Sequence, residues 1–291
     1  MKPPPLDILT PTTIEDAVSL LSDYGMEARP LAGGQSLVPL LNFRLSRPEV
    51  LIDLNKIPEL DYINEVGDQI EIGAMTRERS IEFSELIRDC APLLWEATKN
   101  IAHLPIRSRG TIGGSLANAD PAAEYPAAAL ALEMVFLVQS IRGERLIKSS
   151  DFFQDVLTTS LEPDELLTKI IIPKIPENSG AAFEEIARRH GDFAIAGVAA
   201  QITFRDKIPT AVNLAACGAG PVAMRLCASE TIILKEGIGR DAIKAAAAAA
   251  AASVDPMSDH NASASYRRRL TRVVTARAID KALHNAGVVD V

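Results

Sequence analysis

The chain has 291 residues and a formal net charge of −8, and it is 47% hydrophobic and 23% charged. This length leaves room for two or three modest domains with a substantial core. The negative charge argues against non-specific binding to nucleic acid or anionic membranes, since both are negative too. No apolar run approaches the roughly 18 residues of a membrane span, and the N-terminus lacks the apolar core of a signal peptide. We therefore expect a cytoplasmic protein with no integral membrane segment and no nucleic-acid partner.

The cysteines and histidines do not form a metal-binding pattern. Cys90, Cys217 and Cys227 are widely spaced, and no His-Glu-x-x-His segment occurs. A structural zinc site or an iron–sulfur cluster needs about four close ligands. We therefore expect no metal site in this chain. The spacing also supports no Ser-His-Asp or Cys-His pairing, so the sequence predicts no catalytic residue.

The first 177 residues predict two small αβ subdomains, residues 1–60 and 61–177. Thr12 and Glu15 have the spacing of a capping box, and apolar residues at helical intervals follow them. Prolines and an Asn-Ser-Gly segment around residues 173–180 predict a linker. The expected elements are strands at 50–54, 69–76, 134–139 and 165–172, and helices at 14–24, 37–41, 80–88, 93–102 and 121–132.

The C-terminal third has a different character. It predicts an antiparallel meander followed by helices, so the whole chain is predicted to be α+β. The alanine run at 245–252 predicts a helix packed closely on a neighbour. Tyr266 to Arg269 and Arg272 line the last helix, and we interpret them as surface ion pairs or a subunit contact rather than an anion site. The expected elements are strands at 181–189, 194–205 and 208–217, and helices at 222–235, 239–254 and 262–286.

Two glycine-rich turns stand out, Gly-Gly-Gln-Ser at 33–36 and Gly-Gly-Ser at 113–115. Paired glycines allow positive φ and a close approach of the backbone to a ligand, and their N–H groups beside a helix start suit a pyrophosphate. Either cluster alone also fits a simple tight turn. Neither matches the Rossmann or P-loop glycine pattern. The residues alone therefore predict a dinucleotide or other diphosphate, held between two turns that lie close together.

Longer matches around these turns indicate a family. Residues 32–37 and 111–124 resemble the paired FAD motifs of the FAD-binding medium subunits of molybdenum hydroxylases, the carbon monoxide dehydrogenase and xanthine dehydrogenase family. Residues 188–196 resemble the C-terminal-domain signature of that family, and the resemblance extends over essentially the whole chain. It implies that the two αβ subdomains form a PCMH-type FAD-binding domain, residues 1–177. A C-terminal flavoprotein domain, residues 178–291, would add an antiparallel sheet with a helical bundle.

The resemblance also implies which residues bind FAD. Asp120 matches an acidic residue near the adenosine and ribitol part, although an Asp before Pro121 also suits a helix N-cap. Asp192 and Phe193 match the segment that approaches the isoalloxazine ring, and Phe193 lacks the hydroxyl of the Tyr found in some relatives. The implied cofactor-binding residues are Leu31, Ala32, Gly33, Gly34, Gln35, Ser36, Leu37, Ala102, Ile106, Thr111, Ile112, Gly113, Gly114, Ser115, Asp120, Leu166, Leu167, Asp192 and Phe193.

In such a family the chain would be one subunit of an oxidoreductase. The resemblance implies a large subunit with the molybdenum cofactor and a small subunit with two [2Fe–2S] clusters, in a dimer of heterotrimers. FAD in this chain would receive electrons from the clusters and pass them to an external acceptor. One alternative is a stand-alone flavin-dependent oxidoreductase. Another is a non-enzymatic assembly protein whose glycine turns hold a different phosphate ligand.

Overall fold

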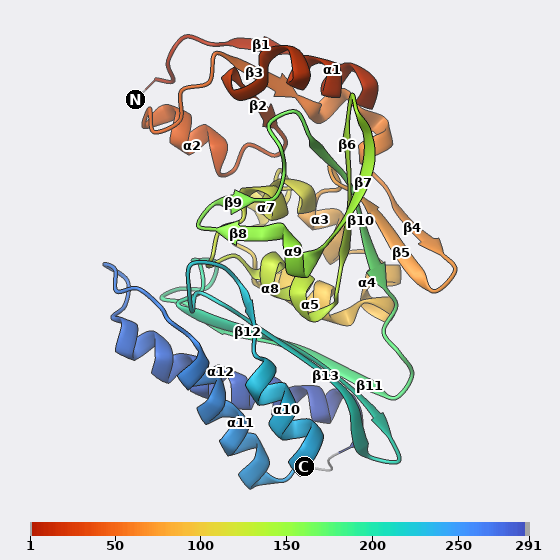
Figure 1. The fold of residues 1–291 in the computed structure, drawn as a ribbon, viewed down its shortest axis with the longest axis vertical. Helices are drawn as coiled ribbons and strands as arrows, with labels where there is room; N and C mark the ends of the chain where they lie inside the picture. Colours follow the sequence, from red (N-terminus) through yellow and green to blue (C-terminus); the bar gives the residue numbers. More distant parts are fainter. Residues whose placement is uncertain (1, 289–291) are drawn as a thin grey trace.

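The computed structural model describes residues 2–288. Its N-terminal lobe is a small parallel sheet with two helices (Figure 1). Thr13 begins the first helix because its side-chain oxygen accepts a hydrogen bond from the N–H of Asp16 at 3.1 Å. The cap thus lies one residue later than the predicted box. The strands, in the order β1-β3-β2, and the helices are β1 Asp7–Leu9, α1 Ile14–Tyr24, β2 Ala28–Leu31, α2 Leu37–Asn42 and β3 Val50–Asp53.

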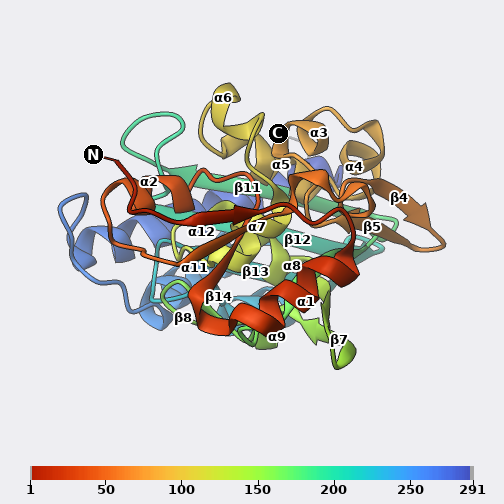
Figure 2. The same ribbon diagram turned by 90° about the horizontal axis from the view of Figure 1, so that it is seen from above.

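The middle lobe is built on a five-stranded antiparallel sheet in the order β4-β5-β10-β6-β7. Figure 2 shows the N-terminal lobe from above, with helix α7 lying under it. The strands are β4 Ile63–Val66, β5 Gln69–Gly73, β6 Val135–Ser140, β7 Gly143–Lys148 and β10 Leu166–Pro173, with a small ribbon of β8 Phe153–Asp155 and β9 Thr158–Thr159. The helices are α3 Glu78–Glu82, α4 Glu85–Cys90, α5 Pro92–Asn100, α6 Leu104–Arg107, α7 Ile112–Asn118, α8 Glu124–Ala131 and α9 Ser149–Phe152.

The C-terminal lobe is an antiparallel sheet with three helices on its outer face (Figure 1). Ala246 and Ala250 of the alanine run are fully buried in its core, as expected for close helix packing. The elements are β11 Ser179–Ile186, β12 Ala196–Arg205, β13 Ile208–Cys217, β14 Met224–Arg225, α10 Cys227–Glu236, α11 Arg240–Ser253 and α12 Ala264–Asn285.

Helix α8 joins the middle and C-terminal lobes. All eight of its residues are buried. The N–H of Gly218 donates to the carbonyl of Pro121 just before the helix, at 2.7 Å. At the other end, the Asn213 side chain donates to the carbonyl of Ala131 at 3.0 Å. The C-terminal lobe is therefore hydrogen-bonded to the chain at both ends of this helix. These bonds also hold the C-terminal lobe next to the segment that follows the second glycine turn.

The α+β class is confirmed, and so are most predicted elements, but three expectations were wrong. The helix expected over 121–132 begins only at Glu124, and a separate helix, α7, contains the second glycine turn. The helix expected over 80–88 is two short helices, α3 and α4. The helix expected over 222–235 starts at Cys227, after the short strand β14. None of the helices within residues 2–288 is long and apolar enough to cross a bilayer.

Candidate cofactor-binding site

The two glycine turns meet directly. A Cβ atom at Gly33 would lie 2.2 Å from the carbonyl oxygen of Arg109, a distance that real side chains do not adopt. A Cβ at Gly114 would lie 3.2 Å from the Cβ of Ala32. Residues 32–36 and 109–115 are therefore in contact, as the sequence predicted. Glycine at 33 is required by the close approach of the two backbones.

A polar bridge joins the same two turns. The Asn55 side chain donates to the carbonyl of Ala32 at 3.1 Å. Arg77 donates from one guanidinium nitrogen to the Asn55 side-chain oxygen and from another to the carbonyl of Arg109. Both carbonyls are thus held by side chains from neighbouring segments. Sequence reasoning missed Asn55 and Arg77, because only the fold brings them to the junction.

The first turn offers a set of free donors. Within residues 2–288, the backbone N–H groups of Gly33, Gly34, Gln35 and Ser36 donate to no protein acceptor. Gly34 has φ of +74°, a left-handed conformation that favours glycine. The Gln35 side chain donates to the carbonyl of Gly33 at 3.0 Å and closes the turn. Successive backbone donors of this kind suit an anion.

The second turn is built differently from the prediction. Gly113 and Gly114 lie in the first turn of α7, and their φ angles are not positive. Their N–H groups are already used, by the carbonyl of Ala74 at 2.9 Å and by the N-cap side chain of Thr111 at 3.1 Å. Gly113 is instead required by space, since a Cβ there would lie 2.5 Å from the Cβ of Ala74. The expectation of paired positive-φ glycines was therefore wrong everywhere except Gly34.

Ala102 and Ile106 lie on the segment that leads into the second turn. Ala102 has φ of +41°, and the N–H of Gly110 donates to the carbonyl of Ile106 at 2.7 Å. The buried side chain of Arg107, in the same segment, donates to the carbonyls of Ile101 and Ala102 at 2.7 and 3.0 Å. The same guanidinium makes two 3.0 Å hydrogen bonds to the partly buried carboxylate of Glu82.

Asp192 and Phe193 come from the C-terminal lobe and lie next to this segment. A Cβ at Gly191 would lie 2.5 Å from the ring of His103, so the loop touches the residue beside Ala102. Both Asp192 and Phe193 are exposed, Phe193 by 58%. The loop therefore contacts the segment that leads into the second turn, and the Phe193 ring on it is uncovered.

The remaining predicted site residues lie around the second turn and in the core. The Asp120 side chain accepts a hydrogen bond from the N–H of Ala122 at 2.9 Å, and α8 is capped by Ala123, so Asp120 is not a helix N-cap. Leu166 and Leu167 are both only 4% exposed on β10, and they belong to the cores of the N-terminal and middle lobes respectively.

One buried carboxyl, Glu78, lies beside the second glycine turn, and another, Glu124, begins helix α8. A Cβ at Gly110 would meet the carboxylate of Glu78, and burial raises the pKa of Glu78 to about 7. Burial and, next, the neighbouring charge of Glu185 raise the pKa of Glu124 to about 8. Both carboxyls therefore carry less negative charge near neutral pH than exposed carboxyls would.

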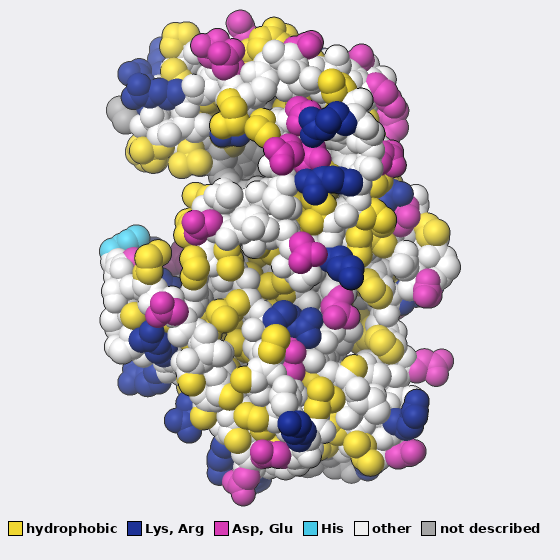
Figure 3. Space-filling model, in the orientation of Figure 1, with side chains coloured by type: hydrophobic (Ala, Val, Ile, Leu, Met, Phe, Trp, Pro, Cys, Tyr) yellow, Lys and Arg dark blue, Asp and Glu magenta, His cyan; other side chains and the backbone are white. Residues whose placement is uncertain are grey.

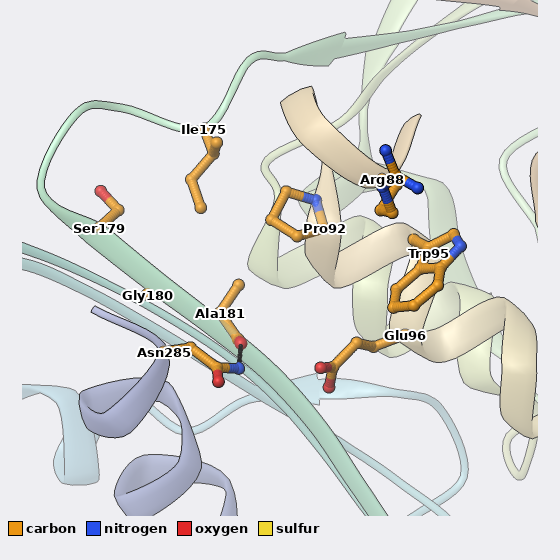
Figure 4. Close-up of a pocket in the computed structure, with 9 residues that line it drawn as sticks. All are labelled: Arg88, Pro92, Trp95, Glu96, Ile175, Ser179, Gly180, Ala181 and Asn285. Carbon is orange, nitrogen blue, oxygen red and sulfur yellow. Dashed lines mark hydrogen bonds between the residues drawn. The ribbon is translucent and has the colours of Figure 1, made fainter. Parts of the chain in front are cut away.

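Figure 3 shows a hollow between the N-terminal lobe and the rest of the molecule, with hydrophobic side chains along its upper edge. A separate cavity of about 250 Å³ lies between α5 and β11, where Asn285 donates to the carbonyl of Ala181 at 2.8 Å (Figure 4). None of its lining residues belongs to the glycine turns. Residues 2–288 hold no group of three or more His, Cys, Asp or Glu placed to bind a metal ion.

The donor turn and the glycine contact fit the diphosphate of a dinucleotide. Comparison with known proteins gives its identity. Residues 4–175 match the model of the FAD binding domain in molybdopterin dehydrogenase. Residues 181–282 match the CO dehydrogenase flavoprotein C-terminal domain.

Individual relatives agree over their whole length. The chain is 42% identical to the 6-hydroxypseudooxynicotine dehydrogenase complex subunit alpha of Paenarthrobacter nicotinovorans, over 98% of this chain and 97% of that one. It is 35% identical to the carbon monoxide dehydrogenase medium chain of Hydrogenophaga pseudoflava, over 97% and 98%. A solved structure of carbon monoxide dehydrogenase from that organism superposes with a TM-score of 0.96 at 36% identity, covering 98% of this chain and 99% of that one.

The fold and the site thus define an FAD-binding subunit of an oxidoreductase. The chain belongs to the family of FAD-binding medium subunits of molybdenum hydroxylases, which includes the carbon monoxide dehydrogenase medium chains. The resemblance seen in the sequence is confirmed, and so is FAD as the cofactor of this subunit.

Proposed function

We propose that this chain is the electron-transfer subunit of a heteromeric molybdenum-containing hydroxylase. Electrons would come from iron–sulfur clusters in a small partner subunit and leave for an external acceptor, while substrate is oxidised at a molybdenum cofactor in a large partner subunit. The names of the relatives support partner subunits, since one is the alpha subunit of a dehydrogenase complex and another is a medium chain. We extend the proposal to a dimer of heterotrimers and to a cytoplasmic location.

The observation that carries this proposal is the contact between the two glycine turns, with four free N–H groups on the first. We propose that Gly33, Gly34, Gln35 and Ser36 bind the FAD diphosphate through the backbone. Thr111 and Ser115 would contribute hydroxyls from the second turn. Bound FAD accepts electrons singly and releases them in pairs, and the protein supplies its position and surroundings.

The other predicted residues have proposed places around that diphosphate. Ala102 and Ile106 would line the approach to the ring, and Asp192 and Phe193 would contact it from the C-terminal lobe. Asp120 would lie on the adenosine and ribitol side. No residue of this chain is assigned as a catalytic acid or base. We keep residues 1–177 and 178–291 as the two proposed domains.

The test is to purify the chain from its native host through a small tag and to identify what comes with it. We expect about one FAD per chain, together with one chain that carries the molybdenum cofactor and one that carries two [2Fe–2S] clusters. Yellow protein without partners, whose flavin is bleached by a substrate, would favour a stand-alone oxidoreductase. Colourless protein that binds no added FAD would contradict the proposal.

A further inference from the structure

Arg267 on helix α12 is a buried cation that ties two loops together. The sequence suggested a surface residue, but its exposure is only 8%. One guanidinium nitrogen donates to the carbonyls of Ile195 and Gly218, at 2.7 and 3.0 Å. The other terminal nitrogen pairs with the carboxylate of Asp259 at 2.8 Å. A charge-assisted donor buried in this way holds its acceptors firmly.

Both carbonyls belong to segments that border the candidate site. Ile195 is the second residue after Phe193. The N–H of Gly218 donates to the carbonyl of Pro121, the residue after Asp120, at 2.7 Å. Arg267 thus connects the backbone that leaves the exposed Phe193 loop with the backbone that follows the second glycine turn.

Little room exists for this junction to shift. Gly218 has φ of +67°, and a Cβ there would lie 2.8 Å from the carbonyl oxygens of Ala194 and Ile195. The N–H of Ile195 also donates to the carbonyl of Ile186 at 2.8 Å. The loop between Ile186 and Ile195 is therefore anchored at its base, and Arg267 supplies the charged part of that anchor.

We propose that Arg267 is a positioning residue for the bound flavin, because it sets the place of Asp192 and Phe193 relative to the ring. This inference rests on the proposed function. It goes beyond it by assigning a role to a residue that does not itself line the glycine turns. Arg267 acts through the two carbonyls that it holds.

The test compares Arg267→Gln with a matched control, Arg268→Gln, in the complete chain. Arg268 neighbours Arg267 but is exposed, and its side chain pairs with the exposed Asp255 at 2.7 Å. Three quantities are measured: FAD bound per chain, fluorescence of the bound flavin, and hydrogen exchange of residues 187–196 in FAD-free protein. Thermal stability is recorded for each variant.

For Arg267→Gln we expect bound flavin whose fluorescence changes by about twofold or more, because the contacts and water access of the ring beside Phe193 are altered. We also expect exchange in residues 187–196 to rise about tenfold. Arg267→Lys restores part of both, because it keeps a charged donor. Arg268→Gln behaves as wild type. A lower melting temperature with unchanged fluorescence and unchanged exchange overturns the inference, since Arg267 would then serve stability alone.

Should Arg267→Gln fail to fold, Asp259→Asn replaces it, because that carboxylate side chain is 43% exposed and its loss leaves the guanidinium in place. For Asp259→Asn, changes in fluorescence and exchange smaller than those expected for Arg267→Gln support the inference. The absence of any change in both overturns it. A wild-type chain that binds no FAD contradicts the proposed function itself. If the wild type binds FAD and the Arg267→Gln variant shows the same flavin fluorescence and the same exchange, only the positioning role is contradicted.

Discussion

The contact between the glycine turns makes Gly33→Ala the sharpest perturbation. The added methyl group would lie 2.2 Å from the carbonyl oxygen of Arg109 and 2.8 Å from the Cα of Gly110, both of them backbone atoms. An ordinary contact needs more than 3 Å, so the two turns must separate by about 1 Å. Inserting a methyl group into such a tight place costs about 1–3 kcal/mol.

Because the FAD diphosphate is proposed to bind across this contact, separation of the turns weakens cofactor binding together with the fold. We expect the Kd for FAD to rise about 10- to 100-fold, since each 1.4 kcal/mol is a factor of ten. FAD is removed from the purified protein and titrated back while flavin fluorescence is followed. Thermal unfolding without FAD measures the separate cost to the fold.

Gly220→Ala is the matched control. A Cβ at Gly220 would lie 3.6 Å from the carbonyl of Val222, an ordinary contact, and its φ is not positive. This variant is expected to bind FAD like the wild type. If Gly33→Ala binds FAD as tightly as Gly220→Ala, the turns do not clasp the cofactor, and the reasoning from the missing Cβ is refuted.

Two further predictions concern buried charges. The pKa of Glu78 is about 4.5 in the unfolded chain and about 7 in the folded protein. Between these values the folded protein binds a proton that the unfolded chain has released. The free energy of unfolding therefore falls as pH rises from about 4.5 through about 7. Between pH 5.5 and 8.5, urea unfolding should show that wild type loses about 2 kcal/mol more than Glu78→Gln, and parallel profiles would contradict the burial argument. Arg107→Met strands the carboxylate of Glu82 and should cost about 3 kcal/mol in the same assay. The control Arg88→Met, at the exposed pair with Asp89, should cost under about 1 kcal/mol. Equal losses of unfolding free energy in the two variants would contradict the argument from burial.

The longer strands and helices could be predicted from the sequence, and strand β2 is an example of an element that could not. The long strands β12 and β13 and the helix α12 follow clear apolar periods, and they were predicted to within two residues. Strand β2 was not predicted, because it contains Pro30, which has no N–H to donate. Proline is tolerated there since β2 is an edge strand in the order β1-β3-β2.

The glycine turns were found from the sequence, but the conformation of the second was not. Two adjacent glycines disfavour a helix by roughly 1 kcal/mol each relative to alanine. Helix α7 nevertheless begins at Ile112, because Thr111 caps it and Gly113 must pack against Ala74. Tertiary contact therefore outweighed local propensity, and no local pattern records such a contact.

The burial of Arg267 could have been predicted from the sequence. It lies three and seven residues before Leu270 and Val274, so the helical period already places it on the buried face of α12. Its charge led us to predict a surface position. By contrast, Asn55 and Arg77 meet the glycine turns only through the fold, and their sequence neighbours give no sign of it.

The most direct test of the site is a crystal structure of the FAD-loaded protein. The proposal predicts the diphosphate oxygens within hydrogen-bond distance of the backbone N–H groups of residues 33–36, with the turn at 111–115 on the other side. A diphosphate bound anywhere else, with those four N–H groups facing only water, would contradict it.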